Sequence, residues 1–179
     1  MPIDMKTVIT TTFVAMVKQK GIDKITVKSL IDACNISRQT FYYHFRDIME
    51  VIEWSLEQAT QDMLSRSLKA ENPVEALSIL ISSAVENRTL IFKLLNSQRR
   101  EQIEQLFVQA ARTYLQELIR NRPHQVALDY ADTEVALDFW AYGITGTLFQ
   151  YCQRDQMDVK SLAEQIYRLL PEKSEQGNK

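Results

Sequence analysis

Residues 26–45 read TVKSLIDACNISRQTFYYHF, and this stretch decides the fold of the N-terminal part of the chain. Thr26 and Ser37 are residue types that cap helix N-termini, and Asn35 belongs to the non-glycine residues that best tolerate left-handed backbone. The corner between the two helices is too short for an antiparallel hairpin, so the helices must cross steeply. The stretch therefore predicts a helix-turn-helix, whose second helix has the geometry to enter a DNA major groove.

The helix-turn-helix combines an apolar face with a polar, aromatic one. We expect the motif to be held on the preceding helix by Val27, Leu30, Ile31, Ile36, Phe41 and Phe45. The outward face of the second helix carries Arg38, Gln39, Thr40, Tyr42, Tyr43 and His44. A solvated surface helix rarely displays two adjacent tyrosines beside Arg, Gln and His, which favours an interface. The alternative is that Tyr42, Tyr43 and His44 pack on neighbouring helices.

The outward side chains suit the chemistry of DNA. Arg38 can pair bidentately with guanine and Gln39 with adenine, while a threonine can contact a thymine methyl group or a phosphate. Hydroxyl and imidazole donors suit phosphate oxygens, and the helix N-terminus that carries Thr26 and Lys28 can capture a phosphate. The DNA-binding residues that we expect are Thr26, Lys28, Ser37, Arg38, Gln39, Thr40, Tyr42, Tyr43 and His44.

The charge of the chain is divided unevenly along the sequence. The formal net charge is −2, yet residues 1–46 hold seven basic and three acidic residues and carry +4. The remainder holds 14 basic and 20 acidic residues and carries −6. A basic N-terminal segment on an acidic body is typical of a head that binds a polyanion, although a segment of this charge can also be a solvated face.

The whole chain shows helical periodicity, with no convincing strand alternation. We therefore expect an all-α protein of about nine helices, with an N-terminal three-helix DNA-binding domain over residues 1–46 and a helical dimerisation and regulatory domain over residues 47–179. The helices are expected at about 4–20, 27–34, 37–45, 47–68, 90–95, 98–120, 133–153 and 159–170, with a further one that starts at Pro73 and carries an apolar stripe to Ile81.

Thr26-Val27 and the run ISRQTFYYHFRD at residues 36–47 resemble the helix-turn-helix signature of TetR-family transcriptional regulators. The resemblance is specific over residues 5 to about 55 and architectural beyond them. The short subgroup related to dihydroxyacetone-kinase operon activators is the most similar. The resemblance implies a cytoplasmic homodimer that binds a palindromic operator, is a repressor by family base rate, and dimerises through its last two helices.

Two positions depart from the pattern of that family. The usual Ala-Gly corner is Cys34-Asn35 here, which is chemically tolerable. The lysine that the family places at the start of its fourth helix, where it contacts a phosphate, is Ile48. Without this cation, affinity for DNA is expected to depend more on Lys28, on Tyr43 and on the helix dipole.

The segment 135–151 is expected to form the dimer interface. A recognition helix with few cations binds DNA weakly, and a dimer doubles the phosphate contacts. The segment is apolar on nearly every side and contains two glycines, each of which costs a helix about 1 kcal/mol and suits close helix–helix approach. The interface residues that we expect are Trp140, Gly143, Ile144, Gly146, Thr147, Tyr151, Leu162 and Ile166. A merely buried core helix is the alternative.

A pocket for a small effector is a weaker expectation, because aromatic residues at helical spacing more often form core. Its walls would be Phe92, Leu95, Phe107, Tyr114, Trp140 and Tyr142. Some members of the resembled subgroup answer to a protein co-regulator instead, so the effector is expected to be a small molecule or a protein. Either signal would reach the recognition helices through the helix at about 47–68.

Other function classes fit the sequence less well. There is no Gly-rich phosphate loop, HExxH or GxSxG motif, so we expect no enzyme and no cofactor. Cys34 and Cys152 lack a CxxC partner and are expected to be small apolar core residues. The alternatives are a helical protein-interaction module without DNA binding and a metal sensor built on His124, Cys152 and nearby Asp residues. The start of the chain resembles no signal peptide, and no apolar run is long enough for a membrane span.

Overall fold

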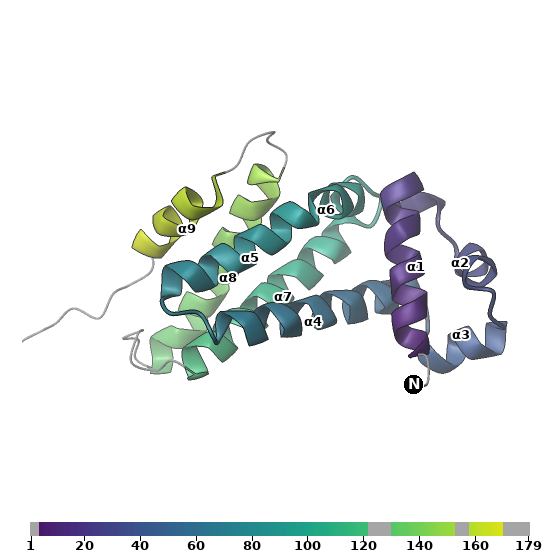
Figure 1. The fold of residues 1–179 in the computed structure, drawn as a ribbon, viewed down its shortest axis with the longest axis horizontal. Coiled ribbons are helices and arrows are strands. Elements are labelled where there is room, and N and C mark those ends of the chain that lie inside the picture. Colours follow the sequence, from purple (N-terminus) through teal and green to yellow (C-terminus); the bar gives the residue numbers. More distant parts are fainter. Residues whose placement is uncertain (1–3, 122–129, 153–157, 170–179) are drawn as a thin grey trace, which may run out of the picture. The chain divides into compact units, whose positions relative to one another are not determined.

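The computed structural model describes residues 4–121, 130–152 and 158–169, and all regular structure in these ranges is helical (Figure 1). The helices are α1 (Met5–Lys20), η1 (Ile22–Lys24), α2 (Val27–Cys34), α3 (Arg38–His44), α4 (Ile48–Ser67), α5 (Pro73–Glu86), α6 (Arg88–Leu95), α7 (Arg100–Asn121), α8 (Tyr130–Tyr151) and α9 (Val159–Arg168). The predicted all-α fold is confirmed, and only the 3-10 turn η1 was not expected. The predicted helix ends at Gln153 and Leu170 lie outside the described residues. Among the helices described, none is both long enough and apolar enough to cross a lipid bilayer.

The chain divides into two compact units. Unit 1 comprises Met1–Ala59 and Asn87–Leu106, and unit 2 comprises Thr60–Glu86 and Phe107–Lys179. The long helices α4 and α7 therefore contribute residues to both units. The compact units follow a different division from the predicted boundary after residue 46, which stays a prediction.

Unit 1 is organised around the buried face of α1. Asp4 caps this helix, and its last turn ends at Gly21, whose φ of 79° is left-handed backbone that glycine adopts without strain. Packing on α1 and on its neighbours α2 and α6 buries Ile9, Phe13, Val17, Leu30, Ile31, Ile91, Leu94 and Leu95. Because α2 contacts both α1 and α3, this core fixes the helix-turn-helix motif (Figure 1).

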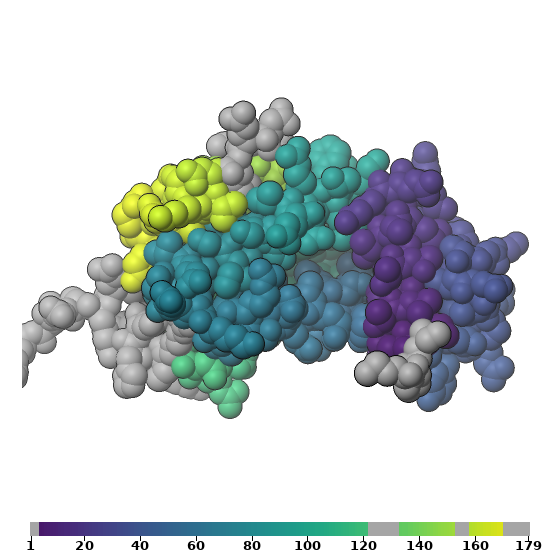
Figure 2. Space-filling view, viewed as in Figure 1, coloured from purple at the N-terminus to yellow at the C-terminus, as the bar shows by residue number. Residues whose placement is uncertain are grey.

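Unit 2 has its own core, in which α9 lies along α5 (Figure 2). The apolar stripe of α9 is short and regular, because Leu162, Ala163 and Ile166 follow helical spacing. These side chains are buried together with Leu77, Leu80, Ile81, Leu115, Leu137, Ala141, Ile144 and Leu148. The unit therefore joins α5, α7, α8 and α9 around one apolar cluster.

Tyr114 is the largest fully buried side chain of the described residues, and its hydroxyl ties three helices of unit 2 together. The hydroxyl oxygen lies 2.7 Å from Ser67 Oγ and 3.1 Å from the carbonyl oxygen of Ala76. A buried hydroxyl needs such partners, because an unsatisfied polar group in a core is costly. The core of unit 2 thus contains a satisfied polar centre between α4, α5 and α7.

Tyr114→Phe is expected to lower the free energy of unfolding by about 1–2 kcal/mol, because it removes the buried hydroxyl and keeps the ring. Chemical denaturation followed by circular dichroism measures this change. The matched control is Tyr43→Phe at an exposed tyrosine, which should stay within about 0.5 kcal/mol of the unchanged protein. Equal stability of the Tyr114→Phe and Tyr43→Phe variants would contradict the described hydrogen bonds.

Candidate nucleic-acid interface

The helix-turn-helix begins with a reciprocal cap at the start of α2. The side chain of Thr26 accepts a hydrogen bond from the backbone N–H of Ser29, and Ser29 Oγ accepts one from the backbone N–H of Thr26. At its other end, α2 stops at Asn35, which has φ 52° and ψ 46°. A single residue in left-handed conformation turns the chain sharply, which confirms the predicted role of Asn35 in the corner.

Helix α3 is capped at its N-terminus by Ser37 and is held on the core of unit 1 by two buried phenylalanines. Ser37 Oγ accepts a hydrogen bond from the backbone N–H of Thr40 at 2.9 Å. Phe41 and Phe45 have 0% and 1% of their surface exposed, and their ring centroids lie 6.2 Å apart. Phe45 also has extended backbone, which ends the helix. One face of α3 is therefore fixed to the core of unit 1, and the other face is left to solvent.

The solvent face of α3 carries the residues expected to read DNA. Arg38 and Gln39 are exposed, and Tyr42 and Tyr43 expose 50% and 84% of their surface. Tyr43 therefore does not pack on a neighbouring helix, as the alternative interpretation would require. Its ring contacts only the edge of His44 among the ring pairs of the described residues, at a centroid distance of 5.0 Å. Large exposed rings beside exposed hydrogen-bond donors suit an interface.

The remaining expected contacts lie around this face. Thr26 and Lys28 are exposed at the start of α2, and His44 is half-buried at the end of α3. The hydroxyl groups of Ser37 and Thr40 lie 2.8 Å apart within the helix cap. The structure thus places all nine expected residues on two contacting helices or at their N-caps, and their contacts with DNA stay predictions.

The start of α4 is acidic rather than basic. Asp47 Oδ1 accepts a hydrogen bond from the backbone N–H of Glu50 at 3.0 Å. The backbone N–H of Arg46 donates to Glu50 and is the main reason that the pKa of this carboxyl lies below its usual value. Ile48, where the resembled family has lysine, is buried with 3% of its surface exposed. The first turn of α4 therefore offers no cation of its own to a phosphate.

Sequence reasoning missed a cation that the fold brings to this region. The ammonium nitrogen of Lys6 lies 5.3 Å from the ring centroid of Phe45 and 5.8 Å from that of Trp54. The two rings are in edge-to-face contact with each other. No sequence spacing signals this arrangement, because the three residues come from distant parts of unit 1 and meet only through packing.

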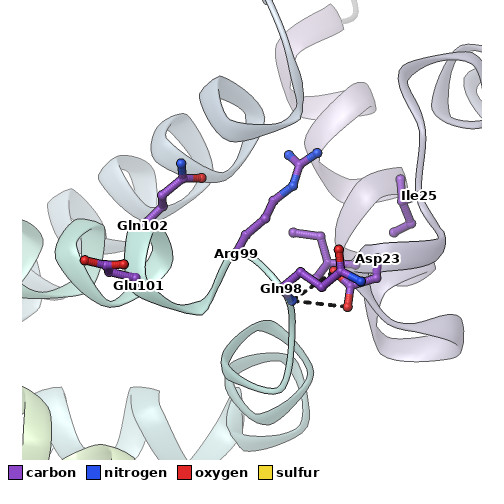
Figure 3. A pocket seen from close by; sticks show the side chains of 7 residues that line it. Asp23, Ile25, Gln98, Arg99, Glu101 and Gln102 are labelled. Atoms are coloured by element: carbon purple, nitrogen blue, oxygen red, sulfur yellow. Dashed lines mark hydrogen bonds between the residues drawn. The ribbon is translucent and has the colours of Figure 1, made fainter.

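A second feature of unit 1 is a polar hollow between η1 and the turn before α7. It has a volume of about 560 Å³ and is lined by Ile22, Asp23, Ile25, Gln98, Arg99, Glu101 and Gln102. Figure 3 shows Asp23 facing Gln98, whose backbone N–H lies 3.3 Å from both carboxylate oxygens. The exposed charges of both signs make this hollow poorly suited to an apolar effector.

The expected effector-pocket residues are distributed over both units. Phe92 is half exposed and Leu95 is buried, both in unit 1, whereas the other four belong to unit 2. Tyr114 and Trp140 share the core of unit 2, but Tyr142 exposes 65% of its surface. Phe107 contacts the ring of Phe149. An effector pocket built by these residues stays a prediction.

The expected dimer residues divide into a buried group and a more exposed group, both in unit 2. Trp140, Ile144, Leu162 and Ile166 are buried by the chain itself, while Gly143 and Gly146 are exposed and Thr147 and Tyr151 are half-buried. Within the segment 135–151, where the interface is expected, the large apolar side chains that α8 exposes are Val135, Phe139 and Tyr142, with 73%, 74% and 65% of their surfaces accessible. Their spacing of four and three residues places them on the same side of α8.

An ion pair borders this exposed face of α8. Arg112 of α7 donates from Nε to Asp138 Oδ1 at 2.7 Å and from Nη2 to Glu134. The hydrogen bond to Asp138 is the main reason that the pKa of Arg112 is raised. Both carboxylates lie on α8, so Arg112 connects the two helices beside the exposed apolar residues.

The metal-sensor alternative receives no support from the described residues, which contain no group of metal-ligating side chains. Cys152 is buried, and its Sγ lies 3.7 Å from the carbonyl oxygen of Ala84. His124 lies outside the described residues.

Two family models match the sequence. Residues 10–53 match one described as bacterial regulatory proteins of the tetR family, and residues 71–172 match one described as a transcriptional regulator C-terminal region. No curated protein matches the sequence.

Solved structures with the same fold cover nearly the whole chain. A dihydroxyacetone kinase operon activator, DhaS, is 18% identical with a TM-score of 0.69, over 93% of this chain and 94% of its own. A protein from Listeria innocua is 17% identical with a TM-score of 0.72, over 94% and 93%. A TetR transcriptional regulator from Streptococcus agalactiae is 18% identical with a TM-score of 0.62, over 92% of each chain. At these identities the likeness concerns the fold.

Asn35→Val is expected to lower the free energy of unfolding by about 1–2 kcal/mol, because a β-branched residue is strained in left-handed backbone. Asn35→Gly, the matched control, should be as stable as the unchanged protein or slightly more stable. Urea denaturation distinguishes the two. Equal losses in both variants would mean that the side chain of Asn35 matters more than the backbone conformation of the corner.

Proposed function

This chain belongs to the TetR family of bacterial transcriptional regulators, and from that premise we propose that it binds a palindromic DNA operator as a homodimer. The observation that carries the proposal is the solvent face of α3. Arg38, Gln39 and Tyr43 are exposed on a helix whose opposite face is locked by buried phenylalanines. A rigid helix with exposed bidentate donors is what direct readout of the major groove requires.

The roles of these residues follow from their chemistry. Arg38 and Gln39 lie in the first turn of α3, the part of a recognition helix that contacts base edges. Tyr42, Tyr43 and His44 lie further along α3, where phosphate contacts fix the position of the protein without reading sequence. The start of α2, with Lys28, offers free backbone donors and a charge to a further phosphate.

The exposed apolar face of α8 supports the homodimer. Val135, Phe139 and Tyr142 lie along one side of this helix, which also has exposed glycines that allow a second helix to approach closely. Burial of each such side chain is worth about 1.5–3 kcal/mol, and a two-fold axis would bury each of them twice. The two recognition helices would then reach successive major grooves on one side of the duplex.

The proposed regulator acts as a repressor, and its effector is a small molecule or a protein co-regulator. Repression rests on the base rate of the family alone. Helix α4 is the proposed route of the signal, because its residues up to Ala59 belong to unit 1 with the helix-turn-helix and its later residues belong to unit 2. An effector acts by favouring one separation of the two recognition helices over another.

Substitutions in α3 test the division between reading and positioning residues. Gln39→Ala should relax the preference at one base pair by about 1–3 kcal/mol, because one bidentate contact is lost. Tyr43→Ala should weaken binding about equally on every duplex, because a phosphate contact carries no sequence information. Fluorescence anisotropy measures both, with duplexes that the wild-type protein selects from a random pool and with single-base variants of them.

If both variants lose the same affinity on every duplex, the proposed division of roles is wrong. If the wild-type protein shows only salt-sensitive binding without sequence preference, the helix-turn-helix serves contacts with a protein instead. Circular dichroism of both variants shows whether α3 is still folded, since each substitution lies on its solvent face.

The dimer is tested by Phe139→Glu, which places a charge on the exposed face of α8. We expect the wild-type protein to have about twice the chain mass of 20.8 kDa and the variant to approach the mass of one chain. Light scattering coupled to gel filtration measures both. Phe92→Glu is the matched control, because it makes the same change at a half-exposed phenylalanine on α6 and should leave the dimer intact. An unchanged mass for Phe139→Glu would place the interface elsewhere.

A further inference from the structure

Lys6 is held on an aromatic shelf that we define as the rings of Phe45 and Trp54. Its ammonium nitrogen is 5.3 Å and 5.8 Å from the two ring centroids, within the range of cation–π attraction. The rings contact each other edge to face, with their centroids 6.2 Å apart. The shelf therefore restricts where the ammonium can lie. Because the two rings are neutral, they do not neutralise the positive charge of Lys6.

Among the described residues, no carboxylate forms an ion pair with Lys6. The nearby carboxylate of Asp4 serves the cap of α1, where it accepts hydrogen bonds from the hydroxyl of Thr7 at 2.6 Å and from the backbone N–H of Lys6 at 3.2 Å. Lys6 is half-buried, so part of its surface is open to solvent.

The position of Lys6 adjoins the face that is proposed to bind DNA. Phe45, one half of the shelf, directly follows α3, and His44 acts electrostatically on Asp4 at the start of α1. The N-terminal end of α1 therefore lies beside the C-terminal end of α3 (Figure 1). Tyr43 and His44, the proposed phosphate contacts, occupy that same end of α3.

The start of α4 creates the need for a cation at this place. Ile48 is buried, and the first turn of α4 is capped by Asp47 and Glu50, whose carboxylates repel a phosphate. The nearest cation in the sequence, Arg46, is paired with Glu50 at 3.2 Å. Affinity for DNA depends on the number of phosphates that the protein neutralises, so a cation from another helix would offset this loss.

We propose that Lys6 binds a phosphate of the DNA backbone from its aromatic shelf and supplies the cation that the first turn of α4 lacks. The proposal rests on the proposed function of the chain as a DNA-binding protein. An ammonium that is already confined by the shelf loses less conformational freedom when it binds than a free surface lysine does. Its contact contributes to every DNA sequence alike, because phosphates carry no base identity.

Lys6→Met is the decisive variant, because it keeps an unbranched stem on the shelf and removes only the charge. One phosphate contact per protomer should lower the slope of log K against log salt concentration by about 0.9, or about 1.8 for a dimer. Between about 50 and 200 mM salt, the wild-type protein should therefore lose about 12-fold more affinity than this variant. Fluorescence anisotropy on the full-length protein measures both slopes, with a selected duplex and a random one.

The control is Lys18→Met, which removes the same charge from an exposed position in the last turn of α1. Its slope should equal that of the wild-type protein, and Lys6→Arg should keep the wild-type slope because it restores a cation on the shelf. A thermal melt of each variant shows whether the substitution changes the stability of the fold as well as the binding to DNA. A merely structural Lys6 would lower the melting temperature of Lys6→Met and leave the slope unchanged.

Equal slopes for Lys6→Met, Lys18→Met and the wild-type protein would overturn the assignment of Lys6. If Lys6→Met does not fold, the assignment is tested by measuring the affinity of the wild-type protein for duplexes that each carry a single uncharged methylphosphonate linkage. Neutralising the contacted phosphate should cost the wild-type protein affinity, and Lys6→Arg should depend on that same phosphate. Should the wild-type protein fail to bind DNA at all, the proposed function fails rather than this assignment alone.

Discussion

The burial of Phe41 and Phe45 beneath α3 is the constraint on which the proposed interface depends. Both rings are almost completely inaccessible, and they fix the rotation of a helix that is only seven residues long. A helix this short is not stable alone, so tertiary packing decides which side chains face outward. Because the two phenylalanines are buried on one face of α3, Arg38, Gln39 and Tyr43 on the other face are turned to solvent. The same burial also makes Phe45 available as one half of the shelf under Lys6.

A shortage of cations is the second constraint. The N-terminal 46 residues carry only +4, and the helix start that holds a lysine in the resembled family begins here with buried Ile48. Binding to DNA must therefore draw on several weak sources: helix N-termini, hydroxyl donors and the doubling of contacts in a dimer. Two features would independently raise the number of phosphate contacts. The exposed apolar face of α8 would do so by forming the proposed dimer, and Lys6 by adding a cation to each protomer.

Local features of the fold were predictable because local chemistry decides them. The caps at Thr26 and Ser37, the left-handed Asn35 and the stop at Gly21 follow from residue type alone. Long-range features were not. Lys6 meets Phe45 and Trp54 only after three segments pack, and no periodicity reveals which face of the uniformly apolar α8 stays outside. Sequence reasoning therefore assigned the whole segment 135–151 to the interface and did not separate buried Trp140 and Ile144 from exposed Phe139.

Whether a symmetric dimer reads DNA with α3 can be tested by selecting bound duplexes from a random pool. Purified protein is mixed with random duplexes, and the bound fraction is amplified and sequenced. We expect a palindromic consensus whose half-sites are about one helical turn, roughly 10 base pairs, or a multiple of it apart. An asymmetric single site, or no enrichment over the starting pool, would contradict it.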